Sequence, residues 1–227
     1  MSLLGGGAVA IWHDIAPEGR DEFYAWHGSE HMPERVGIPG FLRGRRFVAI
    51  DADLEFFNLY ETRRVAVLRG EDYHTRLNSP TPWTLSTVKH FRSVARSLAQ
   101  VVASLGSADG GIIATLRYDV AGDRATAHPA AMAEHVLPEL CKMPGIAGAH
   151  LLVADMEASG EVNAEQRARG ATNAVPRYAL LVEGWGDEAP FIAATRDALT
   201  LDRLQPFGAI EPLRLGFYRH QITVTAA

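Results

Sequence analysis

The chain has 227 residues, of which 47% are hydrophobic and 22% are charged, and its net charge is −5 at pH 7. This composition is typical of a globular protein that buries its own core, and it excludes an intrinsically disordered chain. Lysines and arginines are scattered apart from Arg43 to Arg46 and Arg63-Arg64. Without a sustained basic stripe for a phosphate backbone, nucleic acid is not an expected partner.

Cysteine usage and hydropathy indicate the compartment. Cys141 is the only cysteine, which excludes an internal disulfide, so nothing suggests an oxidising compartment. No apolar run reaches the roughly 18 residues of a membrane helix, and the first residues lack the pattern of a secretory signal. We therefore expect a cytoplasmic protein that has no membrane partner.

The first half of the chain predicts six elements in the order strand, helix, strand, strand, helix, strand. Ala8 to Ile15 is apolar without alternation, which predicts a strand covered on both faces. Pro17 opens the first helix, which Pro33 should bend or loosen before Gly37 ends it. The remaining elements are expected at residues 41–50, 55–62, 70–94 and 96–104.

The second half predicts the same order of elements. Strands are expected at residues 112–120, 146–155, 178–184 and 213–225, and helices at residues 128–142 and 187–199. A polar segment, 156–176, separates two of these strands where the first half has only a short turn. A structureless segment of this length is usually a mobile loop or a functional lid. We expect it to lie outside the core and to be more mobile than its surroundings, because it offers little apolar area.

A motif on the first helix recurs about 105 residues later. Glu30-His31 precedes Pro33-Glu34 in the first copy, and Glu134-His135 precedes Pro138-Glu139 in the second. Solenoid repeats are only about 20 to 50 residues long, so this spacing indicates two copies of a whole small unit. The order of elements is the ferredoxin-like arrangement. We therefore predict an α+β protein of two ferredoxin-like units, residues 1–106 and 107–227, with the insertion at about 156–176.

The motif around the first helix resembles a known superfamily. Its residues are Trp26, Glu30-His31, Pro33-Glu34-Arg35, Pro39-Gly40-Phe41, Arg46-Phe47 and Leu77 to Thr84. They are similar to the dimeric α/β-barrel superfamily, in particular its ether-degradation-protein-like (EthD-like) branch. The resemblance implies that the two units pack sheet to sheet within one chain. The superfamily includes cofactor-independent monooxygenases, lactone isomerases, polyketide cyclases and haem enzymes, so the fold alone decides no reaction.

His31 and Arg46 are the predicted catalytic residues. An imidazole titrates near neutrality, so His31 suits a general base or a hydrogen-bond donor. Because His135 has the corresponding place in the second copy, a structural role suits the two histidines slightly better, in which each binds backbone carbonyls freed by the helix proline. Arg46 lies on a predicted strand where the second copy has Leu151. An inward Arg46 would hold an oxyanion or carboxylate, whereas an outward one would lie at the surface.

One local pattern suggests a metal. His27-Gly28-Ser29-Glu30-His31 matches the H-x-x-E-H signature of inverted zinc proteases. Such a site needs a third protein ligand and a larger scaffold, and the second copy has Ala131 in place of His27. We therefore predict no metal and no bound cofactor. Because the superfamily includes haem enzymes, haem binding stays an alternative, with a helix histidine such as His135 as the axial ligand.

The leading functional hypothesis is an enzyme whose first unit encloses a small hydrophobic or aromatic metabolite. The resemblance implies monooxygenase-, isomerase- or cyclase-like chemistry, with proton transfer by His31. The residues expected to contact the ligand are Trp12, Trp26, His27, Tyr60, Trp83 and His135. Two alternatives stay open: a non-catalytic small-molecule-binding or accessory protein, and a duplicated barrel without a ligand. A small molecule is the expected partner, and a homodimer is a further option.

Overall fold

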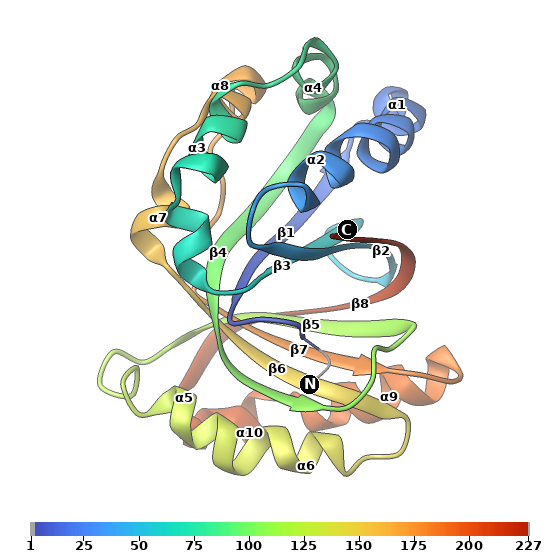
Figure 1. Ribbon diagram of the computed structural model, residues 1–227. Helices are drawn as coiled ribbons and strands as arrows, with labels where there is room; N and C mark the ends of the chain where they lie inside the picture. Colours follow the sequence, from blue (N-terminus) through green and yellow to red (C-terminus); the bar gives the residue numbers. More distant parts are fainter. Residues whose placement is uncertain (1–2, 227) are drawn as a thin grey trace.

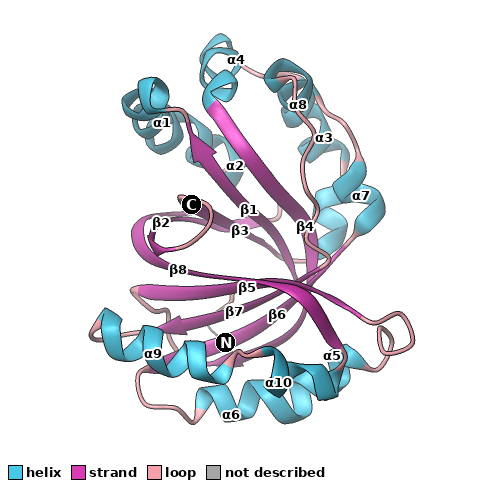
Figure 2. Cartoon of the chain, turned by 180° about the vertical axis from the view of Figure 1, so that it is seen from behind, coloured by secondary structure: helices cyan, strands magenta, loops and turns pink. Residues whose placement is uncertain are grey.

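The computed structural model describes residues 3–226 as antiparallel strands with helices on their outer side (Figure 1, Figure 2). The strands are β1 (Gly7–Ile15), β2 (Phe41–Asp51), β3 (Phe56–Thr62), β4 (Phe91–Gly106), β5 (Ile112–Val120), β6 (Ile146–Ala154), β7 (Tyr178–Gly184) and β8 (Ala209–Thr225). The helices are α1 (Arg20–Trp26), α2 (Met32–Val36), α3 (Glu71–Asn78), α4 (Pro82–Thr87), α5 (His128–Ala131), α6 (Leu137–Cys141), α7 (Met156–Gly160), α8 (Ala164–Arg169), α9 (Glu188–Ala198) and α10 (Leu201–Leu204).

All eight strands belong to one closed barrel, in the order β1-β3-β2-β8-β5-β7-β6-β4. Strand β2 pairs with β8, where Phe47 lies opposite His220, and β4 pairs with β6, where Val101 lies opposite Leu152. The hydrogen-bonded ladder therefore runs without a break from one half of the chain to the other. The prediction of two tandem ferredoxin-like units packed sheet to sheet is wrong, because the strands do not form two separate layers.

Two long strands close the barrel. Strand β4 has 16 residues and β8 has 17, and both are longer than the strands predicted at 96–104 and 213–225. Each pairs with a strand of its own half at one end and with a strand of the other half at the other end. Two separate sheets would leave edge strands with unpaired backbone groups, whereas closure removes every edge.

The first helix is interrupted before Pro33, as predicted. Helix α1 ends at Trp26, a π-helical turn covers His27–His31, and α2 follows. Proline has no N–H to donate to the carbonyl four residues earlier, and its ring clashes with that carbonyl, so the preceding turn widens. The second half has a π-helical turn at Met132–Val136, just before Pro138. The same local sequence therefore produces the same distortion twice.

The helical region expected at 70–94 is shorter and divided. Helix α3 ends at Asn78, and α4 begins only after Pro80 and Thr81. The Thr81 hydroxyl caps α4 by accepting a hydrogen bond from the Thr84 backbone N–H at 3.0 Å. Strand β4 already begins at Phe91. Two short helices cover this face less completely than one long helix would.

The hydrophobic core has an inner and an outer part. Trp12, Phe57 and Tyr218 fill the barrel, while Val9 packs beneath the helices outside it. Strand β1 is thus covered on both faces, which confirms the prediction from its unalternating sequence. Outside the second half, α5, α6, α9 and α10 lie against the sheet (Figure 2). Within residues 3–226, no helix combines the length and apolar character needed to span a membrane.

The insertion, residues 156–176, lies outside the barrel as predicted, but it is not structureless. It contains α7 and α8, and the Asn163 side chain caps α8 by accepting from the Gln166 N–H at 2.9 Å. Farther on, the Ala174 N–H donates to the Val94 carbonyl of β4 at 3.0 Å. Although it belongs to the second half of the chain, the insertion packs alongside α3 and α4 of the first (Figure 1). Its greater mobility stays a prediction.

Candidate functional site

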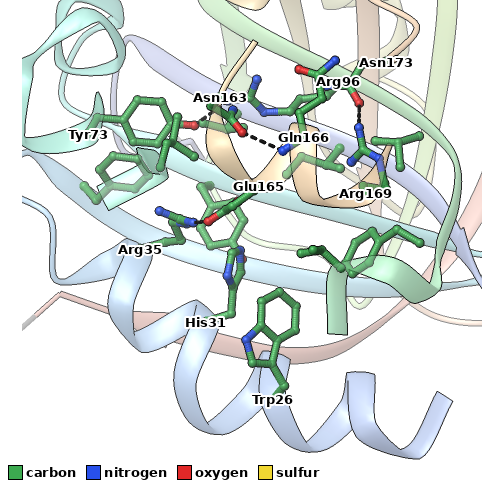
Figure 3. Close-up of a pocket in the computed structure, with 18 residues that line it drawn as sticks. Trp26, His31, Arg35, Tyr73, Arg96, Asn163, Glu165, Gln166, Arg169 and Asn173 are labelled. Atoms are coloured by element: carbon green, nitrogen blue, oxygen red, sulfur yellow. Dashed lines mark hydrogen bonds and ion pairs between the residues drawn. The ribbon is translucent and has the colours of Figure 1, made fainter. Parts of the chain in front are cut away.

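A cavity of about 70 Å³ lies between the outer face of the first-half strands, the helices that cover them, and α8 of the insertion (Figure 3). Its apolar wall consists of Val9, Ile11, Trp26, Phe41, Tyr60, Tyr73, Leu77, Val88, Phe91 and Val94. Its polar lining consists of His31, Arg35, Arg96, Asn163, Glu165, Gln166, Arg169 and Asn173. Small-molecule sites usually measure about 300 to 1,000 Å³, so a ligand of that size requires the cavity to widen.

His31 borders this cavity with an unused nitrogen. The residue is only 8% exposed, and its Nδ1 has no hydrogen-bond partner. Its ring lies 4.3 Å from the Trp26 ring, centroid to centroid. Burial holds the pKa of His31 well below its usual value, and the nearby Arg35 charge lowers this pKa further. The imidazole is therefore neutral near pH 7 and able to accept a proton or a hydrogen bond.

Tyr60 projects from β3 into the same cavity. Its hydroxyl lies 3.2 Å from His27 Nε2, and the other ring nitrogen of His27 lies 3.3 Å from Arg46 Nη1. A guanidinium only donates, so His27 Nδ1 accepts and its proton lies on Nε2, which then donates to the Tyr60 oxygen. Burial raises the pKa of Tyr60, so the phenol stays protonated. Its hydroxyl hydrogen remains available to a ligand.

Arg46 does not meet His31, contrary to the predicted catalytic pair. Its Nε donates to the Gln221 side chain at 2.9 Å, and its guanidinium lies over the Tyr24 ring at 4.8 Å. Arg46 points outward from the barrel toward the helix, where it contacts His27. It reaches the cavity only through His27 and Tyr60, because the alternation of side chains along β2 directs it to that side.

Three arginines of the cavity are not among the site residues predicted from the sequence. Arg35 forms an ion pair with Glu165, and this pair links α2 to the insertion. Arg96 Nη2 donates to the Tyr73 hydroxyl at 2.7 Å, and Arg169 donates to the Asn173 side chain. Arg35 directly follows the repeated Pro33-Glu34 and could have been singled out. Arg96 and Arg169 carry no local signal, since only the folded insertion brings them together.

The other predicted contact residues are dispersed. Trp26 lines the cavity, and its indole N–H donates to the Thr84 hydroxyl at 3.1 Å. Trp12 lies inside the barrel, where its N–H donates to the Thr115 hydroxyl at 2.9 Å. Trp83 is half-buried on α4 outside the cavity lining. The structure therefore brings Trp26 and Tyr60 to His31 but leaves Trp12 and Trp83 elsewhere.

The H-x-x-E-H pattern has a structural explanation. The Glu30 carboxylate accepts a hydrogen bond from the Thr81 hydroxyl at 2.6 Å, which ties the first helix to α4. His27 is bound to Arg46 and Tyr60 as described. Within the described residues 3–226, no group of three or more metal-ligating side chains is assembled.

The residues of the second half do not fit haem. The His135 side chain is 55% exposed, and its ring stacks on Phe207 with centroids 5.9 Å apart. The buried His128 uses both ring nitrogens, one with the Tyr118 hydroxyl at 2.8 Å and the other with the Phe207 carbonyl at 2.7 Å. The sheet beneath is filled by packed side chains such as Leu116. Among the described residues of this half, His128 therefore has no free ring nitrogen for a haem iron, and His135 lies exposed at the surface.

No protein-family model and no curated protein matches the chain, but solved structures do. An anthrone oxidase-like protein is similar with a TM-score of 0.61 at 13% identity, covering 97% of this chain and 92% of that one. A candidate monooxygenase from Lactobacillus acidophilus NCFM has a TM-score of 0.57 at 9% identity, with 97% of each chain covered. A candidate chlorite dismutase has a TM-score of 0.54 at 10% identity, covering 95% of this chain and 94% of that one.

At these identities the likeness concerns the fold alone. Membership of the dimeric α/β-barrel superfamily stays a prediction. The EthD-like branch and the tandem repeat stay predictions.

Proposed function

We propose that this protein is an enzyme without a bound cofactor, in which His31 removes a proton from a small aromatic molecule held in the first-half cavity. The observation that carries the proposal is the buried Nδ1 of His31, which has no partner within the protein. Buried polar atoms are nearly always hydrogen-bonded, and exceptions often serve a reacting group. The aromatic wall around Trp26 and Tyr60 suits a flat, apolar ligand.

The proposed step is proton transfer from a carbon beside a carbonyl group. The C–H bond breaks, the proton moves to His31 Nδ1, and the electron pair is delocalised onto the carbonyl oxygen. Tyr60 donates its free hydroxyl hydrogen to that oxygen and stabilises the developing charge. Arg46 and His27 position Tyr60 and are not in contact with the ligand.

This step is common to isomerase-, cyclase- and monooxygenase-like reactions. In the last case dioxygen is a co-substrate: a C–O bond forms between the carbanion and dioxygen, the O–O bond then breaks, and one oxygen atom stays on the carbon as a carbonyl group while the other leaves as water. The anthrone oxidase-like and monooxygenase neighbours favour this oxygenase-like outcome.

The test uses anthrone, whose methylene protons are acidified by its carbonyl group. We expect the protein to accelerate exchange of these protons with D₂O, measured by NMR, and to consume dioxygen. His31→Gln should lower the exchange rate by about 10² to 10⁴-fold. His135→Gln, at the corresponding but exposed place in the second half, is the matched control and should leave the rate unchanged.

Other outcomes decide between the alternatives. A folded His31→Gln protein that exchanges at the wild-type rate would refute the proposal. Anthrone that raises the melting temperature of the wild-type protein without any exchange would favour the non-catalytic binding protein.

We also propose that residues 1–106 and 107–227 arose by duplication and that the chain belongs to the EthD-like branch. Support comes from the π-helical turn that each half forms before its helix proline, at His27–His31 and Met132–Val136. Cytoplasmic location and a homodimer stay predictions.

A further inference from the structure

Arginines outnumber carboxylates in the cavity. Arg35, Arg96 and Arg169 line it, and Glu165 is the one carboxylate among the residues that form its wall. Glu165 is paired with Arg35. Within residues 3–226, Arg96 and Arg169 make no ion pair with any carboxylate. With His31 neutral, the lining therefore carries a net positive charge.

Burial makes this excess costly without an anion. Arg96 is 8% exposed, and its hydrogen bond goes to the neutral Tyr73 hydroxyl. Arg169 is half-buried, and its Nε has no partner. Burial lowers the pKa of Arg169, and the nearby positive charge of Arg96 lowers it further, while the negative charge of Glu165 offsets part of this lowering. Two positive charges that lie together in a partly buried site are stabilised when a negatively charged group binds between them.

We propose that the substrate of this cavity is an aromatic carboxylate whose carboxyl group is bound by Arg96 and Arg169. This rests on the proposed function of the same site and names its substrate class. Guanidinium groups bind carboxylates in a planar, two-pronged geometry, whereas the surrounding wall is apolar and aromatic. The ring lies along that wall, with the reacting end toward His31 and Tyr60.

Binding also links the two halves of the chain. Arg96 projects from β4 of the first half, and Arg169 ends α8 of the insertion (Figure 3). A carboxylate between them replaces their mutual repulsion by two attractions. The substrate itself therefore holds the insertion over the cavity, which excludes water during proton transfer.

The experiment compares benzoate with benzamide, which has the same size but no charge. Isothermal titration calorimetry should show benzoate binding at least about 10-fold more tightly, as expected for one charge-assisted hydrogen-bonded contact. Arg96→Gln and Arg169→Gln should each weaken benzoate by about 10- to 100-fold and leave benzamide unchanged. Arg96→Lys keeps the positive charge but loses the planar guanidinium, so it should recover part of the benzoate affinity that Arg96→Gln loses.

Two arginines provide matched controls. Arg167 lies on α8 but is exposed, and Arg92 lies exposed on β4. Arg167→Gln and Arg92→Gln should bind benzoate as the wild type does. Equal affinity for benzoate and benzamide, or equal losses in the control variants, would overturn the proposal. Phenyl phosphate that binds where benzoate does not would overturn the assignment to a carboxylate.

The outcomes separate this inference from the proposed function. His31→Gln should still bind benzoate, because His31 does not contact the carboxyl group. Benzoate binding without proton exchange on any probe would refute the proposed enzymatic function but support the anion subsite. Proton exchange on neutral anthrone, together with equal affinity for benzoate and benzamide, would support the enzymatic function and refute the anion subsite.

Discussion

The outer faces of the two halves of the barrel differ, although each is covered by helices that carry the same motif. The second face is filled by Leu151 and its neighbours beneath α5, α6, α9 and α10, and His135 lies at its surface. On the first face α3 and α4 are short, and a gap remains that the insertion closes. There His31 is buried against Trp26. A repeated motif therefore does not imply a repeated site, because the segments around it decide its burial.

The packed outer face of the second half and the outer face of the first half, which contains the cavity, should respond differently to the truncation of a leucine side chain. Leu151 is fully buried, so Leu151→Ala should lower the free energy of unfolding by about 2 to 5 kcal/mol. Leu77 lines the cavity and already lacks packing on one side. Leu77→Ala should therefore cost less, about 1 to 2 kcal/mol. Urea unfolding followed by circular dichroism measures both, and equal costs would contradict the difference between the faces.

Removal of the insertion should uncover the part of the first face that α3 and α4 do not cover. We expect a protein with residues 157–175 replaced by a short Gly-Ser turn to lose benzoate affinity by about 100-fold, or roughly 2.7 kcal/mol. The loss follows because Arg169 and the wall of α8 are gone. Calorimetry measures the affinity, and circular dichroism verifies that the strands persist.

The control for this deletion is a similar replacement of the second-half loop 122–126, which should not change binding. If the shortened protein still bound benzoate normally, the insertion would not form the site.

The ion pair between Arg35 and Glu165 should affect stability and binding in opposite directions. Glu165→Gln leaves the buried Arg35 without its partner, so the free energy of unfolding should fall by about 1 to 3 kcal/mol. The same change removes the negative charge of the cavity, so benzoate should bind about 3- to 10-fold more tightly. Glu161→Gln, an exposed change in the same insertion, is the control. Unchanged or weaker benzoate binding in Glu165→Gln would argue against the anion subsite.

Acid should destabilise the first face through its buried histidines. Burial lowers the pKa of His13 to about 3 and holds those of His27 and His31 well below the ordinary value. The unfolded chain therefore binds more protons once the pH falls below about 6.5, the unfolded pKa. Their contribution is complete above that pH and is lost below it, by about 1.4 kcal/mol per pH unit for each histidine.

Unfolding titrations between pH 7 and 5 measure this slope. His31→Gln should reduce it by the share of one histidine. The exposed change His135→Gln is the control. A slope that is equal in all three proteins would place the burial of His31 in doubt.

Local sequence was enough to locate much of the candidate site. The apolar run of β1, the loosened helix before Pro33 and the insertion at 156–176 all follow from patterns within a few residues. His31 beside a cavity with Tyr60 was likewise predictable, since the helix motif must face the sheet. These features depend on proline chemistry and hydrophobic periodicity, which act over one or two turns of chain.

The amino-acid sequence by itself determined the order of the strands and placed His31 on a helix that packs against the sheet. Only the tertiary structure decided that β2 pairs with β8 and β4 with β6, so that one barrel replaces two sheets. It also decided that Arg46 turns toward His27 and that Arg169 of the insertion joins Arg96. Strand pairing and the direction of side chains depend on contacts between segments far apart in the chain, and no local pattern records those contacts.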